Sequence, residues 1–323
     1  MRGISGVRRV ENMFNGPQKQ HWAPLQPMNN AVPIEIRHRS FQEEEEEHQI
    51  FDIGITIGDP QDPQDVCEYE SIVYTLSRMR EGQFPEPEVV QPEVTASDRG
   101  KLVDWLCRLH YKCQLTTNAL YVCVGILDRV LRKVRISVNK LLLYGCAAML
   151  IASKEEDIQP IQIDQIIMVS EGVLNRQDLI QMENYILDVI DYDITFPTPL
   201  FFLTHFLRIS NKSMEAMLMA RYVMEIELTL PEFIGTASSY MASLAILITR
   251  VFCHEEPWTE ELAIYTGYSF GDLCNDARFI HQALLIGERP ECSFIRRKYA
   301  SEPFYRVALV EVPRVLPTPF DLF

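Results

Sequence analysis

One stretch of the sequence, Leu141–Ser153, constrains the fold more than any other. It is apolar on every side and contains Gly145 and three alanines. Because it is shorter than the roughly 20 residues that span a bilayer, we expect a helix buried on all sides in a protein core. Its small residues would let neighbouring helices approach closely. The chain should therefore fold as a shell of helices around this segment.

Apolar residues recur at helical spacing from residue 98 to about 190, and no strand-like alternation of useful length interrupts them. They form three stripes around the central segment: Leu102, Leu106 and Leu109; Leu120, Val124, Leu127 and Leu131; and Leu179, Met182, Ile186 and Ile190. Phe196–Pro199 break the pattern, and a second helical array follows. The sequence thus predicts an all-α chain with two helical domains, at 98–196 and 197–310, and a tail at 311–323.

The region before the first domain divides into two parts. Residues 1–64 contain scattered Pro, Asn, Gln and Gly and the acidic run Glu43–Glu47, without a sustained apolar period, which is typical of a disordered tail. In 65–97, Asp65 can cap an amphipathic helix, whose apolar face we expect to pack on another part of the protein. A proline-rich connector follows this helix. The apolar face of that helix comprises Tyr69, Ile72, Val73, Leu76 and Met79.

Charge and absent motifs limit the functions that the chain can have. It carries 45 acidic against 30 basic residues, a net charge of −15, so we expect neither nucleic acid nor a membrane as a partner. Common nucleotide-binding, hydrolase and metalloprotease motifs are absent and the seven histidines are dispersed, so we expect no catalytic residues, no cofactor and no metal. No secretory signal and no C-x-x-C pair is present, which favours an intracellular protein.

Two charges fall inside apolar helical faces. Lys154 continues the face of Leu150 and Ile151, and Glu183 lies in the stripe of Leu179 and Ile186. A charge in such a position is costly unless it has a partner. Either the two form a mutual or local ion pair, or they line the rim of a groove that binds another chain. Spacing alone supports both interpretations.

Several motifs, in one order, resemble the cyclin family. The N-terminal motifs are D-R-G-K-L-V-D-W-L at 98–106, I-L-D-R at 126–129, K-L-L-L-Y-G-C-A-A-M-L-I-A-S-K at 140–154 and M-E-N-Y-I-L at 182–187. Q-P-E-V-T at 91–95 precedes them, and F-P-T-P-L at 196–200 and W-T-E-E-L-A-I-Y-T-G-Y at 258–268 resemble the cyclin C-terminal domain. The resemblance covers roughly residues 66–310 and is greatest to the mitotic A and B types, the B type above all.

This resemblance implies a fold and a function. The fold would be two consecutive five-helix cyclin-box domains plus an N-terminal helix. The function would be that of a regulatory subunit, in nucleus and cytoplasm, that binds a cyclin-dependent protein kinase as a heterodimer and controls the cell cycle near G2/M. It would act by repositioning the αC helix and the activation segment of the kinase. Substrates and inhibitors of that complex would be further partners.

The resemblance also implies roles for individual residues. Arg99 and Asp128 match a structural ion pair between helices, whereas Lys154 and Glu183 match residues that bind backbone groups of the kinase. Charge-assisted hydrogen bonds would make the second pair effective at an interface.

Around that second pair, the family has an apolar socket for the kinase αC helix. Ile151, Leu187 and Ile194 match positions in this socket. Glu155 stands where the family usually has Phe or Tyr, which removes apolar area and would alter the choice of kinase.

A second face of the first box helix departs from the family. Asp98, Lys101, Trp105 and Arg108 share this face by helical spacing, and we expect it to be exposed. In many cyclins the matching face is an apolar groove for Arg-x-Leu peptides of substrates. Here Asp98 and Lys101 replace Met and Ile, and Arg108 replaces an acidic residue. Leu102 and Trp105 retain the family pattern at their positions. Leu142 stands where a glutamine of the family often contacts the peptide.

Two other classes of protein compete with this interpretation. A general transcription factor with the cyclin fold would bind DNA and polymerase, but the acidic balance of the chain argues against it. A helical-repeat scaffold would show a fixed short period, which the sequence lacks.

Overall fold

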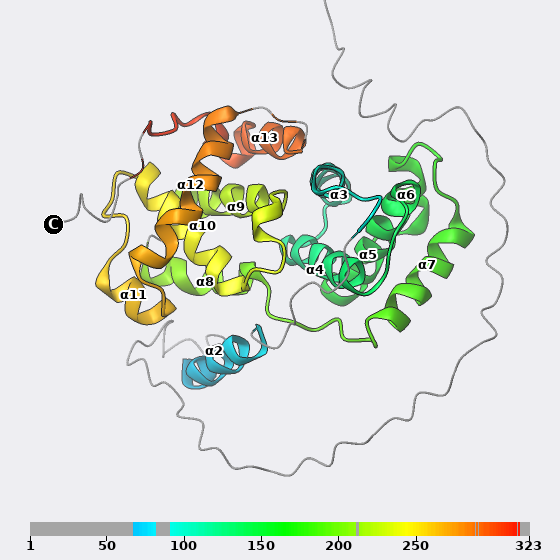
Figure 1. Ribbon diagram of the computed structural model, residues 1–323, viewed down its shortest axis with the longest axis horizontal. Coiled ribbons are helices and arrows are strands. Elements are labelled where there is room, and N and C mark those ends of the chain that lie inside the picture. Colours follow the sequence, from blue (N-terminus) through cyan, green and yellow to red (C-terminus); the bar gives the residue numbers. More distant parts are fainter. Residues whose placement is uncertain are drawn as a thin grey trace, which may run out of the picture. The chain divides into compact units, whose positions relative to one another are not determined.

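The computed structural model describes residues 67–81, 91–210, 213–287, 289, 291–314 and 316. Within these residues every regular element is a helix, which confirms the all-α prediction (Figure 1). The expected disordered tail at 1–64, the Asp65 cap and most of the tail at 311–323 lie outside the described residues.

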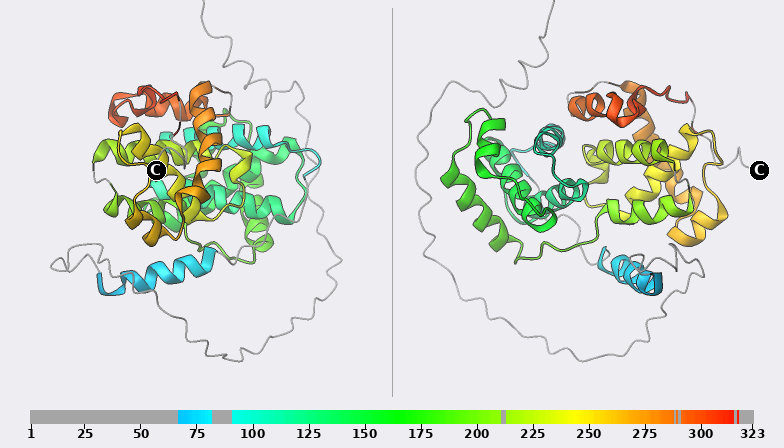
Figure 2. Two further views of the ribbon diagram at one scale, coloured as in Figure 1. Left: turned by 60° about the vertical axis from the view of Figure 1, so that its left-hand side comes forward. Right: turned by 180° about the vertical axis from the view of Figure 1, so that it is seen from behind.

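The first half of the fold is built around α5. Its α-helices are α3 (Ala96–Lys112), α4 (Thr117–Lys133), α5 (Leu141–Glu156), α6 (Ile163–Val169) and α7 (Arg176–Val189), with the 3-10 turn η1 (Val138–Lys140) before α5. Helices α3, α4 and α7 all pack on α5, and the views in Figures 1 and 2 show these helices as one group. The apolar segment thus has the central position that its composition predicts.

Close approach to α5 depends on its small residues. Nearly every residue from Leu141 to Ser153 is buried. A Cβ atom added to Gly145 would lie 3.0 Å from the Leu102 side chain of α3, so a larger residue would push α3 away. Leu102, Leu106 and Leu109 are completely buried, as the helical period of α3 predicts.

The second half repeats this plan around α10. Its α-helices are α8 (Pro199–Ile209), α9 (Met214–Glu227), α10 (Ser238–Phe252), α11 (Glu260–Thr266), α12 (Phe270–Ile286) and α13 (Ser293–Tyr299), with 3-10 turns η2 (Pro231–Phe233), η3 (Glu302–Phe304) and η4 (Val307–Leu309). Helices α8, α9 and α12 pack on α10. The sets α3–α7 and α8–α12 are the two predicted five-helix domains.

The helix before the first domain, α2 (Cys67–Glu81), is oriented differently from the sequence prediction. The apolar face expected to pack on the domains is exposed: Tyr69, Ile72, Val73, Leu76 and Met79 are each 39–53% exposed. The helix instead docks on the second half through Tyr74, which is buried. The Tyr74 hydroxyl donates to the carbonyl of Tyr265 at 2.9 Å, and the two rings lie 5.0 Å apart.

A carboxylate at the end of α2 completes this docking. Glu81 Oε2 accepts the backbone N–H of Ser239 at 2.8 Å, in the first turn of α10, where the sequence itself supplies no capping side chain. Negative charge is favoured at this end of a helix. Polar and aromatic contacts, which helical periodicity does not report, therefore decide which face of α2 is buried.

Helix α13 connects the two halves. Asp104 of α3 accepts the backbone N–H groups of Phe294 and Ile295 at 2.9–3.0 Å and so caps α13. At the other end, Lys298 Nζ donates to both oxygens of Glu225 in α9, at 2.6 and 2.8 Å. Both partners of this second contact are buried, and each satisfies the charge of the other.

Two further properties concern the described residues as a whole. None of their helices combines the length and apolarity needed to cross a membrane. Seven of their cysteines are free thiols, of which five are buried and two are not: Cys107, Cys123, Cys146, Cys274 and Cys292 are buried, and Cys113 and Cys253 are more accessible.

Glu227 contrasts with Glu225, two residues earlier in α9. It is completely buried, yet neither of its carboxyl oxygens has a hydrogen-bond partner among the described residues. Burial raises the pKa of Glu227 well above its ordinary value. Leaving such a group without a donor costs about 1–3 kcal/mol.

Replacing Glu227 with methionine should therefore stabilise the protein by about 1–3 kcal/mol at neutral pH. Because the pKa of Glu227 is raised in the folded chain, that chain binds a proton which the unfolded chain releases. Wild-type stability should then fall as the pH rises above the ordinary glutamate range, and the wild-type and Glu227→Met values should converge at acidic pH.

Chemical denaturation across a pH series measures this difference. Glu215→Met, at an exposed position of the same helix, is the matched control and should change stability little. A Glu227→Met protein that is less stable than wild type at neutral pH would show that the Glu227 carboxylate is stabilised by a partner.

Candidate functional site

The two charges that the sequence places in apolar faces meet at the surface of the first half. Lys154 lies in the last turn of α5 and Glu183 in the middle of α7. Lys154 Nζ donates to Glu183 Oε1. The mutual ion pair, which was one of the two interpretations that the sequence spacing allowed, is therefore present. The Lys154 side chain is 50% exposed and that of Glu183 12% exposed. A partner chain can therefore reach the pair.

The apolar residues expected around this pair are less accessible than a socket requires. Ile151 is only 3% exposed, because its side of α5 faces the core. Leu187 and Ile194 are half-buried, and Glu155 is exposed. The expectation that Ile151 offers contact area is thus not met, whereas Leu187 and Ile194 have surface to offer.

Several exposed apolar residues near this surface escaped the sequence analysis. Ile180 is 41% exposed and stands three residues before Glu183 and seven before Leu187, so helical spacing could have assigned it to the same face. Tyr192 is 65% exposed and follows α7 in the left-handed region, with φ 57°. Its N–H donates to the carbonyl of Leu187, so it folds back on the helix end. No spacing rule predicts such a position.

The face of α3 that departs from the family is only partly open. Lys101, Trp105 and Arg108 are half-buried. Asp98 is also half-buried, and its Oδ2 accepts from the backbone N–H and the hydroxyl of Thr95, at 3.0 and 2.7 Å. Its carboxylate is therefore part of the N-terminal cap of α3.

Two further positions that match the family's docking groove lie inside the fold. Leu102 has no exposed surface, and Leu142 is 5% exposed. Leu102 turns inward because Gly145 leaves room for it, and Leu142 belongs to the buried part of α5. Their burial agrees with the inward stripe of α3 and with the buried segment Leu141–Ser153, and their assignment to the docking face stays a prediction.

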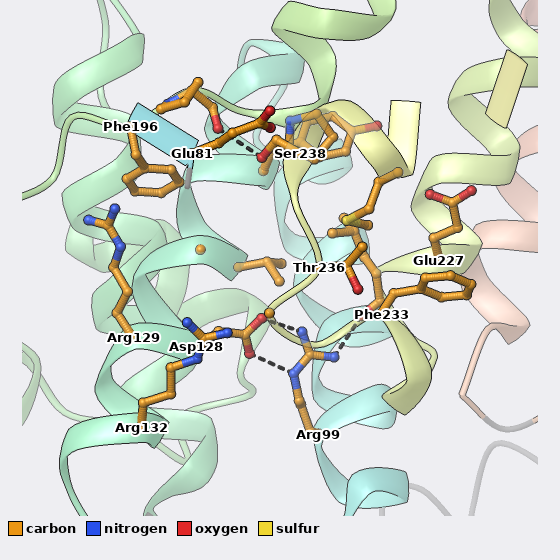
Figure 3. Close-up of a pocket in the computed structure, with 18 residues that line it drawn as sticks. Glu81, Arg99, Asp128, Arg129, Arg132, Phe196, Glu227, Phe233, Thr236 and Ser238 are labelled. Carbon is orange, nitrogen blue, oxygen red and sulfur yellow. Dashed lines mark hydrogen bonds and ion pairs between the residues drawn. The ribbon is translucent and has the colours of Figure 1, made fainter. Parts of the chain in front are cut away.

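A pocket of about 110 Å³ lies between the two halves. It is lined by residues of α3, α4, α9 and α10 and of the segment between the halves (Figure 3). Arg99 crosses it: Nε and Nη2 donate to the two oxygens of Asp128 at 2.6 Å each, and Nη1 donates to the carbonyl of Leu228 at 2.7 Å. The pair thus joins α3 and α4 to the end of α9.

Arg129 lies on the same pocket wall. Its guanidinium stacks on the Phe196 ring at 3.9 Å and donates to the carbonyl of Asp193 at 2.5 Å. Burial, with the nearby charges of Arg132 and Arg80, lowers the pKa of Arg129 to about 10, against the opposing effect of Asp193. These contacts fix the connector to α4. No cluster of metal-ligating side chains occurs among the described residues.

Comparison with known proteins gives concordant matches to both halves. Residues 71–195 match the family described as "Cyclin, N-terminal domain", and residues 197–313 match "Cyclin, C-terminal domain". These two ranges together cover all of the described helices except the first turn of α2.

Curated relatives include proteins named as A-type and B-type cyclins. The chain is 34% identical over 229 residues to cyclin-A1 of Mus musculus, an alignment that covers 70% of this chain and 54% of that protein. It is 27% identical over 257 residues to G2/mitotic-specific cyclin-B of Spisula solidissima, with 79% and 60% coverage. The chain thus spans little more than half the length of these relatives.

A solved structure shares the fold. A viral cyclin from herpesvirus saimiri superimposes with a TM-score of 0.60 at 21% identity, covering 69% of this chain and 97% of that chain. At this identity, the likeness concerns the arrangement of helices.

Removing the Arg99 side chain should destabilise the protein by about 3 kcal/mol, because Arg99→Met leaves Asp128, whose side chain is only 16% exposed, as a charge without its partner. Arg99→Met combined with Asp128→Leu should recover part of this loss, because it removes both charges. Urea denaturation of the single and double variants measures both effects.

Lys133→Met provides the control for that comparison. Lys133 pairs with Asp191 at 2.9 Å, but both side chains are largely exposed. The variant should therefore lose less than about 1 kcal/mol of folding stability. Equal losses in Arg99→Met and Lys133→Met would contradict the structural role of Arg99.

Proposed function

The chain belongs to the cyclin family, and we propose that it is a regulatory subunit that binds and activates a cyclin-dependent protein kinase. The observation that carries this proposal is the Lys154–Glu183 pair at the surface of α5 and α7. The family resemblance assigns kinase contacts to Lys154 and Glu183. Such contacts require the pair to be accessible at the surface, and it is. We propose further that the complex acts in mitotic control, in nucleus and cytoplasm.

The chemistry of the pair suits recognition of a protein backbone. A lysine ammonium has three donors and a carboxylate accepts at both oxygens, so each can keep its bond to the other and bind a further group. Of the two Glu183 oxygens, Oε1 accepts from Lys154. A kinase carbonyl could approach Lys154 while a kinase N–H approaches Glu183 Oε2, each as a charge-assisted bond.

The surface around the pair would supply the apolar part of the interface. Leu187 and Ile194 retain exposed area, and Ile180 and Tyr192 add to it. Exposed apolar residues that border a charged pair resemble the mixed composition of protein interfaces. Glu155 introduces an acidic group at the edge of this surface, which would favour a kinase with a basic or polar group opposite it.

Activation would follow from differential binding to two kinase conformations. If the cyclin contacts the αC helix only in its inward position, the binding energy favours that position, which completes the ATP site and frees the activation segment. In this proposal the chain contributes binding energy, and the kinase performs the chemistry.

Lys154→Ala and Glu183→Ala should each weaken kinase binding by about 2–5 kcal/mol, because each variant leaves a partner group without its charged contact at the interface. Binding of purified cyclin-dependent kinases by calorimetry, together with phosphorylation of a serine-proline substrate peptide, measures the effect. Circular dichroism verifies that the variants remain helical.

Arg176→Ala and Asp164→Ala are matched controls, because these residues form an exposed ion pair at 2.7 Å between α6 and α7. They should leave kinase binding and activation unchanged. Helical Lys154→Ala and Glu183→Ala proteins that activate kinases as well as wild type would refute the assignment.

We also propose that the complex does not select substrates through Arg-x-Leu peptides. Lys101 and Arg108 would repel the peptide arginine, and the buried Leu102 and Leu142 offer no socket for its leucine. Without a socket that buries the peptide leucine, peptide binding loses about 1.5–3 kcal/mol of favourable free energy. Fluorescence anisotropy with a labelled Arg-x-Leu peptide should therefore detect weak binding or none, and low-micromolar binding that Trp105→Ala abolishes would disprove this.

A further inference from the structure

Tyr192 differs from most tyrosines of the chain in its surroundings. All 13 tyrosines lie within the described residues, and five of them are exposed. Tyr192 is the most exposed of the five, at 65%, and Tyr305 follows at 56%. The other three, Tyr69, Tyr111 and Tyr185, lie within α-helices, whereas Tyr192 and Tyr305 do not. Two tyrosines thus combine an open side chain with a position outside the α-helices.

The backbone at Tyr192 forms a turn at the edge of the fold. Helix α7 ends at Val189, and Asp191 and Tyr192 follow with φ values of 54° and 57°, a region that residues other than glycine rarely adopt. Residues 193–198 contain no regular element. Such a turn opens more readily than a helix. Because a protein kinase binds its substrate as an extended segment, Tyr192 is better placed for modification than a tyrosine inside a helix.

Acidic residues lie on both sides of Tyr192. Asp191 and Asp193 are its immediate neighbours in the chain, and their side chains are 83% and 54% exposed. Asp188, also exposed, accepts a hydrogen bond from the Tyr192 hydroxyl at 3.1 Å. An enzyme whose peptide-binding groove carries basic groups would therefore be attracted to this segment by charge.

We propose that Tyr192 is a phosphorylation site for a protein tyrosine kinase whose peptide-binding groove is basic, and that its phosphate opposes the binding of the cyclin-dependent kinase. The modification requires only the open tyrosine and its three aspartates. Its effect on binding rests on the proposed function, because Tyr192 borders the surface assigned to the cyclin-dependent kinase.

The reaction is a phosphoryl transfer from ATP. A carboxylate of the tyrosine kinase takes the proton of the Tyr192 hydroxyl, and the hydroxyl oxygen forms a bond to the γ-phosphorus. The bond from the γ-phosphorus to the oxygen that bridges it to the β-phosphorus breaks, and ADP leaves. The hydroxyl must first give up its hydrogen bond to Asp188, whose exposed carboxylate water can then hydrate.

A phosphate on Tyr192 would lie in an unfavourable position. It carries a charge of about −1.5 to −2 at neutral pH, and it would stand beside the three aspartates at the C-terminal end of α7, where the helix dipole is already negative. Repulsion would displace the turn in which the Tyr192 N–H donates to the carbonyl of Leu187. Because Leu187 and Ile194 belong to the proposed kinase surface, this displacement would remove contact area where negative charge has been added.

The ring of Tyr192 could also serve a partner as an apolar contact alone, which would account for its exposure. Such a contact gains nothing from the three aspartates, whereas recognition by a basic groove depends on them. The experiment therefore changes the aspartates separately from the ring.

The test is phosphorylation of the full chain by ATP and a recombinant tyrosine kinase selected for activity on a glutamate-tyrosine copolymer, followed by mass spectrometry of the phosphopeptides. We expect Tyr192 to be modified about tenfold faster than Tyr305, or more. Tyr305 is the matched control because it is nearly as exposed and has φ 53°, but its neighbours are Phe304 and Arg306. Tyr192→Phe should remove the main phosphopeptide.

A second pair of variants tests the aspartates. Asp191→Asn/Asp193→Asn should slow the modification of Tyr192 by about tenfold, because the attraction to a basic groove is lost. Glu260→Gln/Glu261→Gln makes the same change in net charge at exposed positions of α11 and should alter the rate by about twofold at most. Circular dichroism verifies the fold of every variant.

Binding of a cyclin-dependent kinase is then measured by calorimetry before and after treatment with the tyrosine kinase. Treatment should weaken binding by the wild-type chain by about tenfold or more. It should leave the affinity of Tyr192→Phe at the value which that variant has before treatment.

The outcomes separate this inference from the proposed function. The site is disproved, and the proposed function stands, if Tyr192 is modified no faster than Tyr305, or if Asp191→Asn/Asp193→Asn leaves its rate unchanged. Modified Tyr192 with unchanged binding of the cyclin-dependent kinase disproves the regulatory effect. If no cyclin-dependent kinase binds the untreated chain, the proposed function fails, whereas fast modification of Tyr192 that depends on the aspartates still supports the site.

Discussion

The assembly of the two halves depends on one guanidinium group. Arg99, a residue of α3, donates two hydrogen bonds to Asp128 of α4 and a third to the backbone carbonyl of Leu228, just after α9. Its donors therefore satisfy groups from both halves at once, in a position where the Arg99 side chain is 5% exposed. An arginine can do this because its planar group presents several donors in fixed directions, whereas a lysine would offer a single point charge. The pocket beside it, the stacking of Arg129 on Phe196 and the capping of α13 by Asp104 all belong to the same junction.

Packing within each half and contact between the halves follow different physical rules. Within a half, a helix with small or apolar residues on all sides, α5 or α10, is surrounded by others, and the apolar area removed from water is the driving force. Between the halves and at α2, the contacts include buried charges and caps: Asp104 on α13, Arg99 on the carbonyl of Leu228, and Glu81 on α10. Such contacts are directional, so they fix an orientation that apolar packing alone would leave less defined. Glu227 shows that buried polar groups can also be unfavourable, because a buried carboxyl without a hydrogen-bond donor contributes nothing favourable to stability.

The surface proposed for the kinase lies on α5 and α7, and the face of α3 that departs from the family lies on another helix that packs on α5. Lys154, Glu183 and Leu187 belong to the α5–α7 surface, whereas Lys101, Trp105 and Arg108 lie on α3. Because the positions of these side chains are set by a tightly packed core, each surface is held rigidly without help from its partner. The charges of the two surfaces also differ, since one offers a neutral ion pair and the other carries Lys101 and Arg108.

The sequence by itself determined the class of fold, the central place of α5 and the two-domain organisation, because helical periodicity and the all-round apolar segment report directly on burial. The family motifs also directed attention to Arg99, Asp128, Lys154 and Glu183, although periodicity could not say whether the last two pair with each other. Only the tertiary structure decided that they do, and that α2 exposes its apolar face. The reason is that periodicity describes one helix at a time. Which face of α2 is buried depends on Tyr265 and Ser239, nearly 200 and 160 residues away along the chain, and the close approach of Leu102 to α5 depends on the missing side chain of Gly145.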